Sequence, residues 1–122
     1  VCYSIKHHFE IFKELEIPIN QIIVTGGGTK NKEWIQMLSD VLGIKLQTPS
    51  VTIGACYGDA LMAMIGANHI KDFAEAKKLI ATGKVYYPNL ENTLKYEPYY
   101  KMYIELYKQN KKLMAMMDNI NQ

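Results

Sequence analysis

Arginine is missing from this sequence: all 14 basic residues are lysines, and with 12 acidic residues they give a formal net charge of +2. Without a guanidinium group, the chain has no side chain that clamps a phosphate or carboxylate through two parallel hydrogen bonds. We therefore do not expect a self-sufficient phosphoryl-transfer enzyme of this length. The net charge is also too small to indicate nucleic-acid binding.

Cysteine and long apolar runs are scarce as well. The two cysteines, Cys2 and Cys56, have no metal-type spacing, and a small secreted domain normally carries more, which favours a reducing cytoplasm. No apolar run approaches the roughly 18 residues of a membrane span, and no signal-peptide pattern is found, so we expect no membrane partner. Val1 is not an initiator methionine, which indicates a chain that was processed or cut from a longer one.

The sequence does have the composition of a globular protein, with 48% apolar and 21% charged residues among 122. This length supports one domain or a piece of one. Periodicity and capping residues predict the following elements: helices over 4–16, from Asn31 to Gly43, over 54–65 and from Asp72 to Ala81, a strand buried on both faces over 21–25, a half-exposed strand over 44–48, an extended segment over 86–98, and a long helix after it.

The last helix carries an apolar stripe with three-to-four spacing, for which we expect a place in the core rather than at a partner surface. Its mixed charges are typical of a solvated face. The stripe consists of Tyr99, Met102, Tyr103, Leu106, Leu113, Met117 and Ile120.

The densest signal is the run from Ile22 to Asn31, in which a β-branched strand leads into Gly26, Gly27 and Gly28 and then a helix. Glycines there permit positive φ and let a flat or anionic ligand lie against the backbone. The spacing matches neither a dinucleotide fingerprint nor a P-loop. The glycines alone leave two alternatives, a ligand-binding turn or a tight turn without a ligand.

Asn31 also has two interpretations. Its side chain can cap the helix by accepting an N–H from the first turn. Its amide can also offer a donor and an acceptor to a purine or a ribose. Both roles are compatible with one residue.

Further short motifs follow the glycines at fixed intervals. They are Gly26-Gly27-Gly28-Thr29-Lys30-Asn31, Trp34, Gln36, Asp40-Val41-Leu42-Gly43, Pro49 and Ala55-Cys56-Tyr57-Gly58-Asp59-Ala60. With this order and spacing, the string from Ile17 to Ala67 resembles the C-terminal domain of FGGY-type carbohydrate kinases, the group that contains xylulokinase, gluconokinase, ribulokinase and glycerol kinase. The first helix and the tyrosine-rich tail look like the xylulokinase-type C-terminus, so the resemblance covers nearly the whole chain.

The resemblance implies an α/β, ribonuclease H-like (actin-like) ATPase fold, with residues 1–122 as the later part of the second, C-terminal domain. It also implies that the glycine turn binds the adenosine of ATP. Candidate binding residues are Gly26, Gly27, Gly28, Asn31 and Gly58. Two positions depart from the family, since Ile53 stands where many relatives carry Glu and Asp59 where many carry Ala.

No residue matches the family's phosphate hairpin, sugar site or catalytic aspartate, so we expect no catalytic or metal-binding residue here and Mg²⁺ only in the intact parent enzyme. The hypothesis is the adenosine-binding part of a cytoplasmic kinase that phosphorylates a ketose, aldonate or polyol, xylulose first among them. The chain alone should be inactive. The alternative is a non-enzymatic nucleotide-binding or interaction module, and a homodimer could cover apolar surface. His7, His8, His69, Asp40 and Asp59 receive no catalytic or metal-binding role.

Overall fold

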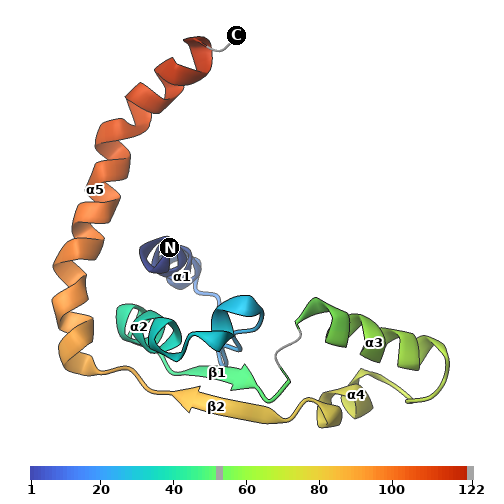
Figure 1. The fold of residues 1–122 in the computed structure, drawn as a ribbon. Coiled ribbons are helices and arrows are strands. Elements are labelled where there is room, and N and C mark those ends of the chain that lie inside the picture. Colours follow the sequence, from blue (N-terminus) through green and yellow to red (C-terminus); the bar gives the residue numbers. More distant parts are fainter. Residues whose placement is uncertain (52–53, 121–122) are drawn as a thin grey trace.

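The computed structural model of the chain describes residues 1–51 and 54–120. Within these residues a two-stranded sheet lies between two groups of helices, with α3 and α4 at one end of the strands and α5 leaving from the other (Figure 1). The elements in chain order are α1 (Cys2–Glu14), the 3-10 helix η1 (Gly27–Lys30), α2 (Lys32–Leu42), β1 (Leu46–Pro49), α3 (Ala55–Gly66), α4 (Phe73–Leu79), β2 (Thr82–Tyr86) and α5 (Leu90–Ile120).

The main core lies between α2 and the sheet. The apolar stripe of α2 buries Ile35, Leu38 and Val41 against Leu46 of β1 and Tyr86 of β2. The predicted ends of this helix are confirmed, because the Asn31 side chain caps its N-terminus and Gly43 adopts the left-handed conformation after its last turn.

The sheet is antiparallel, with Leu46 opposite Tyr86 and Gln47 opposite Val85. Gly83 lies where the register shifts, and a Cβ atom there would be 2.7 Å from the carbonyl oxygen of Pro49. Only a residue without a side chain allows the two backbones to approach this closely. The strand β2, which begins in the stretch after α4, was not predicted from the sequence.

The prediction of a strand over 21–25, buried on both faces, is wrong. A single parallel bridge joins Ile23 to Gln47, through hydrogen bonds from Val24 N–H to the Gln47 carbonyl (2.8 Å) and from Gln47 N–H to the Ile22 carbonyl (3.0 Å). Among the described residues only β1 lies beside this segment, so its other edge has no strand to pair with. Ile23 consequently keeps 50% of its surface exposed.

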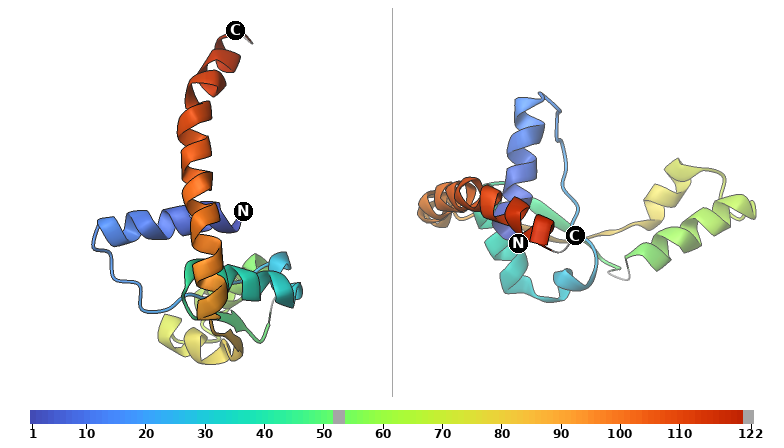
Figure 2. Two further views of the ribbon diagram at one scale, coloured as in Figure 1. Left: turned by 90° about the vertical axis from the view of Figure 1, so that its left-hand side faces the viewer. Right: turned by 90° about the horizontal axis from the view of Figure 1, so that it is seen from above.

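The helix α1 packs across α5 through an ion pair whose lysine is buried and whose carboxylate is partly exposed. The ammonium group of Lys6 lies 2.7 Å from the Glu97 carboxylate and 4.8 Å from the centre of the Tyr100 ring. Tyr3 adds contacts with the rings of Tyr100 and Tyr103. The N-terminal helix therefore lies against the first half of α5, whereas the end of α5 extends away from it (Figure 2).

The prediction of an extended segment over 86–98 is wrong, because α5 begins at Leu90 and contains Pro98. Asn89 starts the helix early, since its side-chain oxygen accepts hydrogen bonds from the N–H groups of Glu91 and Asn92. Proline removes a hydrogen bond inside a helix. Contacts of α5 with α1 and α2 on the same turns, such as that of Glu97, override this local preference.

The expectation that the stripe of the last helix lies in the core is also wrong for the described residues. Tyr99, Met102, Leu106 and Leu113 are all more than half exposed. Figures 1 and 2 show why, since the later part of α5 extends beyond α1 and α2. None of the described helices combines the length and apolar character that crossing a bilayer requires.

A second, smaller core joins α3 and α4, where Leu61, Ile70 and Ala76 are buried together. The predicted capping box is confirmed, because Asp72 accepts the N–H of Glu75 at 2.9 Å. The Glu75 carboxylate in turn accepts the N–H of Lys71 at 2.7 Å.

Candidate functional site

The glycine turn connects the segment beside β1 to α2, with Gly26 as its pivot. Gly26 has φ +96°, a conformation that residues with a Cβ rarely adopt. Its carbonyl oxygen accepts two hydrogen bonds from the buried Thr29, one from the hydroxyl (2.7 Å) and one from the backbone N–H (3.1 Å). These bonds fix the turn from the inside and leave its outer backbone uncovered.

The three glycines of the turn have different surroundings. Ideal Cβ atoms built on Gly26 and Gly27 would meet no atom within 4 Å, so the backbone there faces open space. A Cβ on Gly28 would instead lie 3.0 Å from the Trp34 ring. Gly28 is therefore required by packing inside the chain, whereas Gly26 and Gly27 leave a surface that a ligand could approach.

The start of α3 lies against the same turn. A Cβ on Gly54, the residue that precedes α3, would be 3.7 Å from the Cα of Gly26 and 3.7 Å from the Thr25 hydroxyl oxygen. Gly58 follows one turn into α3, is exposed and also faces open space. The structure thus brings the glycine turn and the first turn of α3 together. Ile53, one of the two departures from the family, lies outside the described residues.

Asn31 lies at the end of the turn, where its capping interpretation is confirmed. Its side-chain oxygen accepts the N–H of Trp34 at 2.9 Å. The side chain is exposed, and the cap leaves its amide nitrogen available for a second hydrogen bond. Asn31 and Gly28 are also joined through the backbone, by the Asn31 N–H and the Gly28 carbonyl at 3.1 Å.

Charged side chains contribute little to this region. Within the part of the chain that the structure describes, no three His, Cys, Asp or Glu side chains gather as they would around a metal ion. Asp59 is exposed on α3. His7 lies 3.4 Å from the Tyr100 hydroxyl, and the His8 ring lies 2.7 Å from the Ser4 carbonyl oxygen.

Asp40 has partners that sequence reasoning missed. It is buried on α2, and its carboxylate accepts hydrogen bonds of 2.8 Å from the Gln36 side chain, the Asn89 N–H and the Asn92 side chain. Gln36, four residues earlier on the same helix, was the only signal in the sequence for this role. Asp40 therefore holds α5 against α2 rather than acting on a ligand.

The side chains whose pKa values are shifted lie at the junction of α1 and α5, away from the glycine turn. Burial raises the pKa of the Tyr100 phenol, and nearby carboxylates, Glu10 first among them, raise it further. Burial likewise raises the pKa values of Tyr3 and of the Cys2 thiol. These groups stay neutral at physiological pH and belong to the packing of the two helices.

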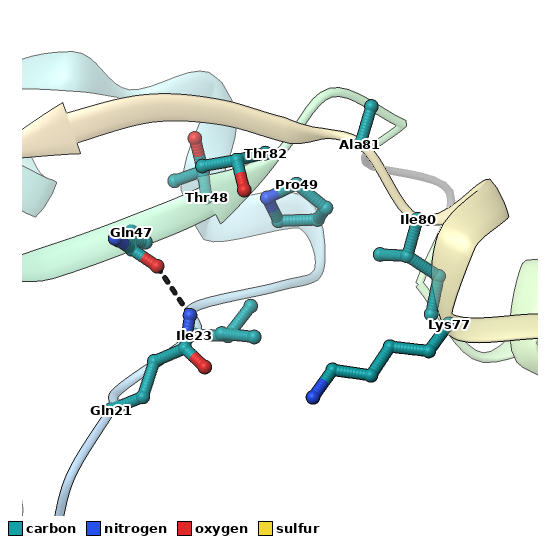
Figure 3. Close-up of a pocket in the computed structure, with 9 residues that line it drawn as sticks. All are labelled: Gln21, Ile23, Gln47, Thr48, Pro49, Lys77, Ile80, Ala81 and Thr82. Atoms are coloured by element: carbon teal, nitrogen blue, oxygen red, sulfur yellow. Dashed lines mark hydrogen bonds between the residues drawn. The ribbon is translucent and has the colours of Figure 1, made fainter. Parts of the chain in front are cut away.

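A separate cavity of about 150 Å³ lies between the segment at 21–23, the end of β1 and α4 (Figure 3). The Lys77 side chain extends from α4 toward Ile23 at its edge. None of the candidate residues predicted from the sequence lines this cavity, so it is distinct from the glycine turn.

Comparison with known proteins gives consistent results. The profile described as "FGGY family of carbohydrate kinases, C-terminal domain" matches residues 1–67. The chain is 35% identical over 106 residues to a probable L-xylulose kinase of Pasteurella multocida, covering 87% of this chain and 21% of that protein. It is 32% identical over 108 residues to a xylulose kinase of Staphylococcus xylosus, and this match covers 88% of this chain and 22% of that protein.

Among solved structures, that of a xylulose kinase from Rhodospirillum rubrum superimposes on 93% of this chain with a TM-score of 0.75 and 21% identity. This likeness confirms the predicted ribonuclease H-like, actin-like ATPase fold. The match covers 23% of that protein. The chain thus spans between a fifth and a quarter of these three relatives.

Proposed function

Because this chain belongs to the FGGY family of carbohydrate kinases, we propose that it forms the adenosine-binding part of an ATP-dependent sugar kinase. Residues 1–122 would be part of the C-terminal domain of that enzyme. The sugar we propose first is xylulose, since several of the similar proteins are named as xylulose kinases.

One observation carries the proposal: the bare backbone of Gly26 and Gly27 lies beside the beginning of α3. Neither glycine has an atom within 4 Å of its Cβ position, and Gly54 brings α3 to within van der Waals distance of Gly26. A surface of this kind accepts a flat ring without side-chain obstruction. An adenine or ribose lying there would meet Gly58 on α3 and the free amide nitrogen of Asn31 at the start of α2.

In this scheme the chain's residues bind and orient the nucleoside end of the nucleotide. ATP supplies the γ-phosphoryl group that is transferred to a sugar hydroxyl. Phosphoryl transfer also needs a base, metal-bound phosphate and in-line positioning, and the described residues offer no carboxylate cluster for Mg²⁺. We therefore assign Mg²⁺, the sugar and the catalytic base to other parts of the enzyme. A cytoplasmic location is proposed with it, supported by two free thiols, Cys2 and Cys56.

Glycine-selective ¹⁵N labelling tests the proposal on this chain, which contains eight glycines. On titration with adenosine, we expect amide signals of Gly26, Gly27 and Gly58 to shift, while those of Gly66 and Gly83 stay in place. ATP should shift the same signals, and xylulose should shift none of them. Weak binding is sufficient for this readout, because fast exchange reports it. Shifts confined to Gly66 and Gly83, or none at saturating adenosine, would contradict the proposal.

A further inference from the structure

The exposed stripe on the second half of α5 is arranged in heptads. Large apolar residues recur every seven positions at Tyr99, Leu106, Leu113 and Ile120, and Met102 and Met116 lie three residues after the first and third of them. All six are between 53% and 81% exposed. Positions a and d of a coiled coil have this spacing, and three heptads over about 30 Å are enough to form one.

This seam is separate from the face that α5 turns toward α1. The contacts with α1 come from Glu97, Tyr100 and Tyr103. Glu97 lies about half a turn around the helix from the seam and Tyr100 about a third of a turn, while Tyr103 occupies the e position at its edge. A second helix could therefore lie along the seam while α1 stays in place. Figure 2 shows the later turns of α5 standing clear of the remaining elements.

Two opposite charges flank the seam on one edge. Glu105 and Lys112 are seven residues apart, so both occupy the g position beside the a residues Leu106 and Leu113. Glu105 lies 4.0 Å from Lys108 and accepts a hydrogen bond from Gln109, with more than half of its side chain exposed. Among the described residues, Lys112 has no carboxylate within 4.0 Å.

We propose that this face of α5 binds a second copy of the same chain, with the two helices antiparallel. In that register, Met102 packs opposite Leu113 of the second copy, and Leu106 opposite Gln109. The same register places Glu105 opposite Lys112 of the second copy, and the twofold axis repeats this ion pair. A parallel pair would instead place Glu105 opposite Asn110, so charge complementarity favours the antiparallel arrangement. Gln109, the polar residue of the seam, would fix the register.

Charge reversal tests the ion pair. In sedimentation equilibrium with the full chain, the variants Glu105→Lys and Lys112→Glu should each raise the dimer dissociation constant at least about tenfold. The double variant should recover most of this loss, because the two charges are exchanged in both copies. Lys111→Glu is the matched control, since it makes the same change on the side of α5 opposite the seam. A monomer at every concentration, or single variants that dimerise like the parent, would overturn the proposal.

Cross-linking tests the orientation in a Cys56→Ser background, which removes the exposed native thiol. Cysteines at positions 102 and 113 of one helix are about 16 Å apart, too far for a disulfide within the chain. The variant Met102→Cys/Leu113→Cys should therefore form a covalent dimer on oxidation, while Met102→Cys alone should not. Efficient linking of Met102→Cys alone would indicate a parallel pair and overturn the proposal. Absence of any linking would do the same, as expected if α5 packs on another part of a longer chain. Sedimentation and cross-linking do not depend on nucleotide binding. A failure of the dimer proposal can therefore be distinguished from a failure of the proposed function.

Discussion

Asp40 on α2 accepts the backbone N–H of Asn89, 49 positions later in the sequence, at 2.8 Å. The same carboxylate accepts the side-chain amide of Asn92 at 2.8 Å, so one buried acidic group joins α2 to the first turn of α5. A negative charge near the N-terminus of a helix is also stabilised by the helix dipole. This junction sets the direction in which α5 leaves the sheet.

Replacing Asp40 by alanine should lower the free energy of unfolding by about 1.5–3 kcal/mol, because three donors from α2 and the start of α5 lose a charged acceptor. Urea denaturation followed by circular dichroism measures this loss. Asp59→Ala is the control, since that carboxylate is exposed on α3 and should change stability by less than about 0.5 kcal/mol. Equal changes in the free energy of unfolding for the two substitutions would show that Asp40 does not stabilise the junction of α2 and α5.

Gly27→Val should weaken nucleotide binding selectively. In the intact kinase we expect the KM for ATP to rise at least about tenfold, or 1.4 kcal/mol, with little change in the KM for the sugar. The branched side chain would occupy the open face of the turn. Gly66→Val is the control, because Gly66 also faces open space but lies at the far end of α3. Similar increases in both KM values would mean that the turn has only a structural role.

Gly83→Ala should destabilise the fold although it adds a single methyl group. That group would lie 2.7 Å from the Pro49 carbonyl oxygen, and overpacking of this kind costs about 1–3 kcal/mol. Thermal unfolding should show a lower Tm than for Gly66→Ala, where the methyl group meets no neighbour. A Tm equal to that of this control would show that the sheet accommodates the methyl group.

Stability should fall at alkaline pH in a way that depends on Tyr100. Burial holds its pKa in the folded chain above the ordinary value of 10.0, so the folded state keeps the proton longer than the unfolded state. The resulting stabilisation is complete below about pH 10 and is lost as the pH rises through the folded pKa. Tyr100→Phe should therefore show a shallower decline in unfolding free energy above pH 10 than the parent. Tyr107→Phe, an exposed position on the same helix, serves as the control, and identical slopes for Tyr100→Phe and the parent would contradict the assignment.

The chain by itself should not turn over ATP with xylulose. Its described residues provide a surface for adenosine but gather no carboxylates for a metal and offer no arginine. A coupled assay for ADP release measures this directly. Turnover above the buffer rate that scales with chain concentration would show that the catalytic groups lie within these residues.

The sequence was informative where local rules decide the structure. Asn31 and Gly43 mark the two ends of α2 as predicted, because capping depends on a few neighbouring residues. The positive φ of Gly26 was predictable for the same reason, since a backbone conformation that favours glycine is a local requirement of the turn. The candidate site was predictable as a turn for this reason. Its position against Gly54 was not, because it depends on where α3 lies in space.

Errors arose where tertiary contacts override local preference. Pro98 suggested an extended segment, but the neighbouring Glu97 is held by Lys6, so the helix continues through the proline. The run at 22–24 resembled a buried strand, but burial requires neighbours on both sides and β1 supplies one. Gly83 carried no local signal, because the need for it comes from Pro49, 34 positions earlier.

The ion pair between Lys6 and Glu97 spans 91 positions, and this has a consequence for folding order. During synthesis the N-terminal helix leaves the ribosome long before its counter-charge does. Until Glu97 arrives, Lys6 has to stay in water, because burying an unpaired ammonium group is strongly unfavourable. The helix α1 can therefore complete its docking only after Glu97 has been made, although its contacts with α2 are available earlier. A nascent chain shorter than about 100 residues should expose Cys2 to a thiol reagent that the completed fold excludes.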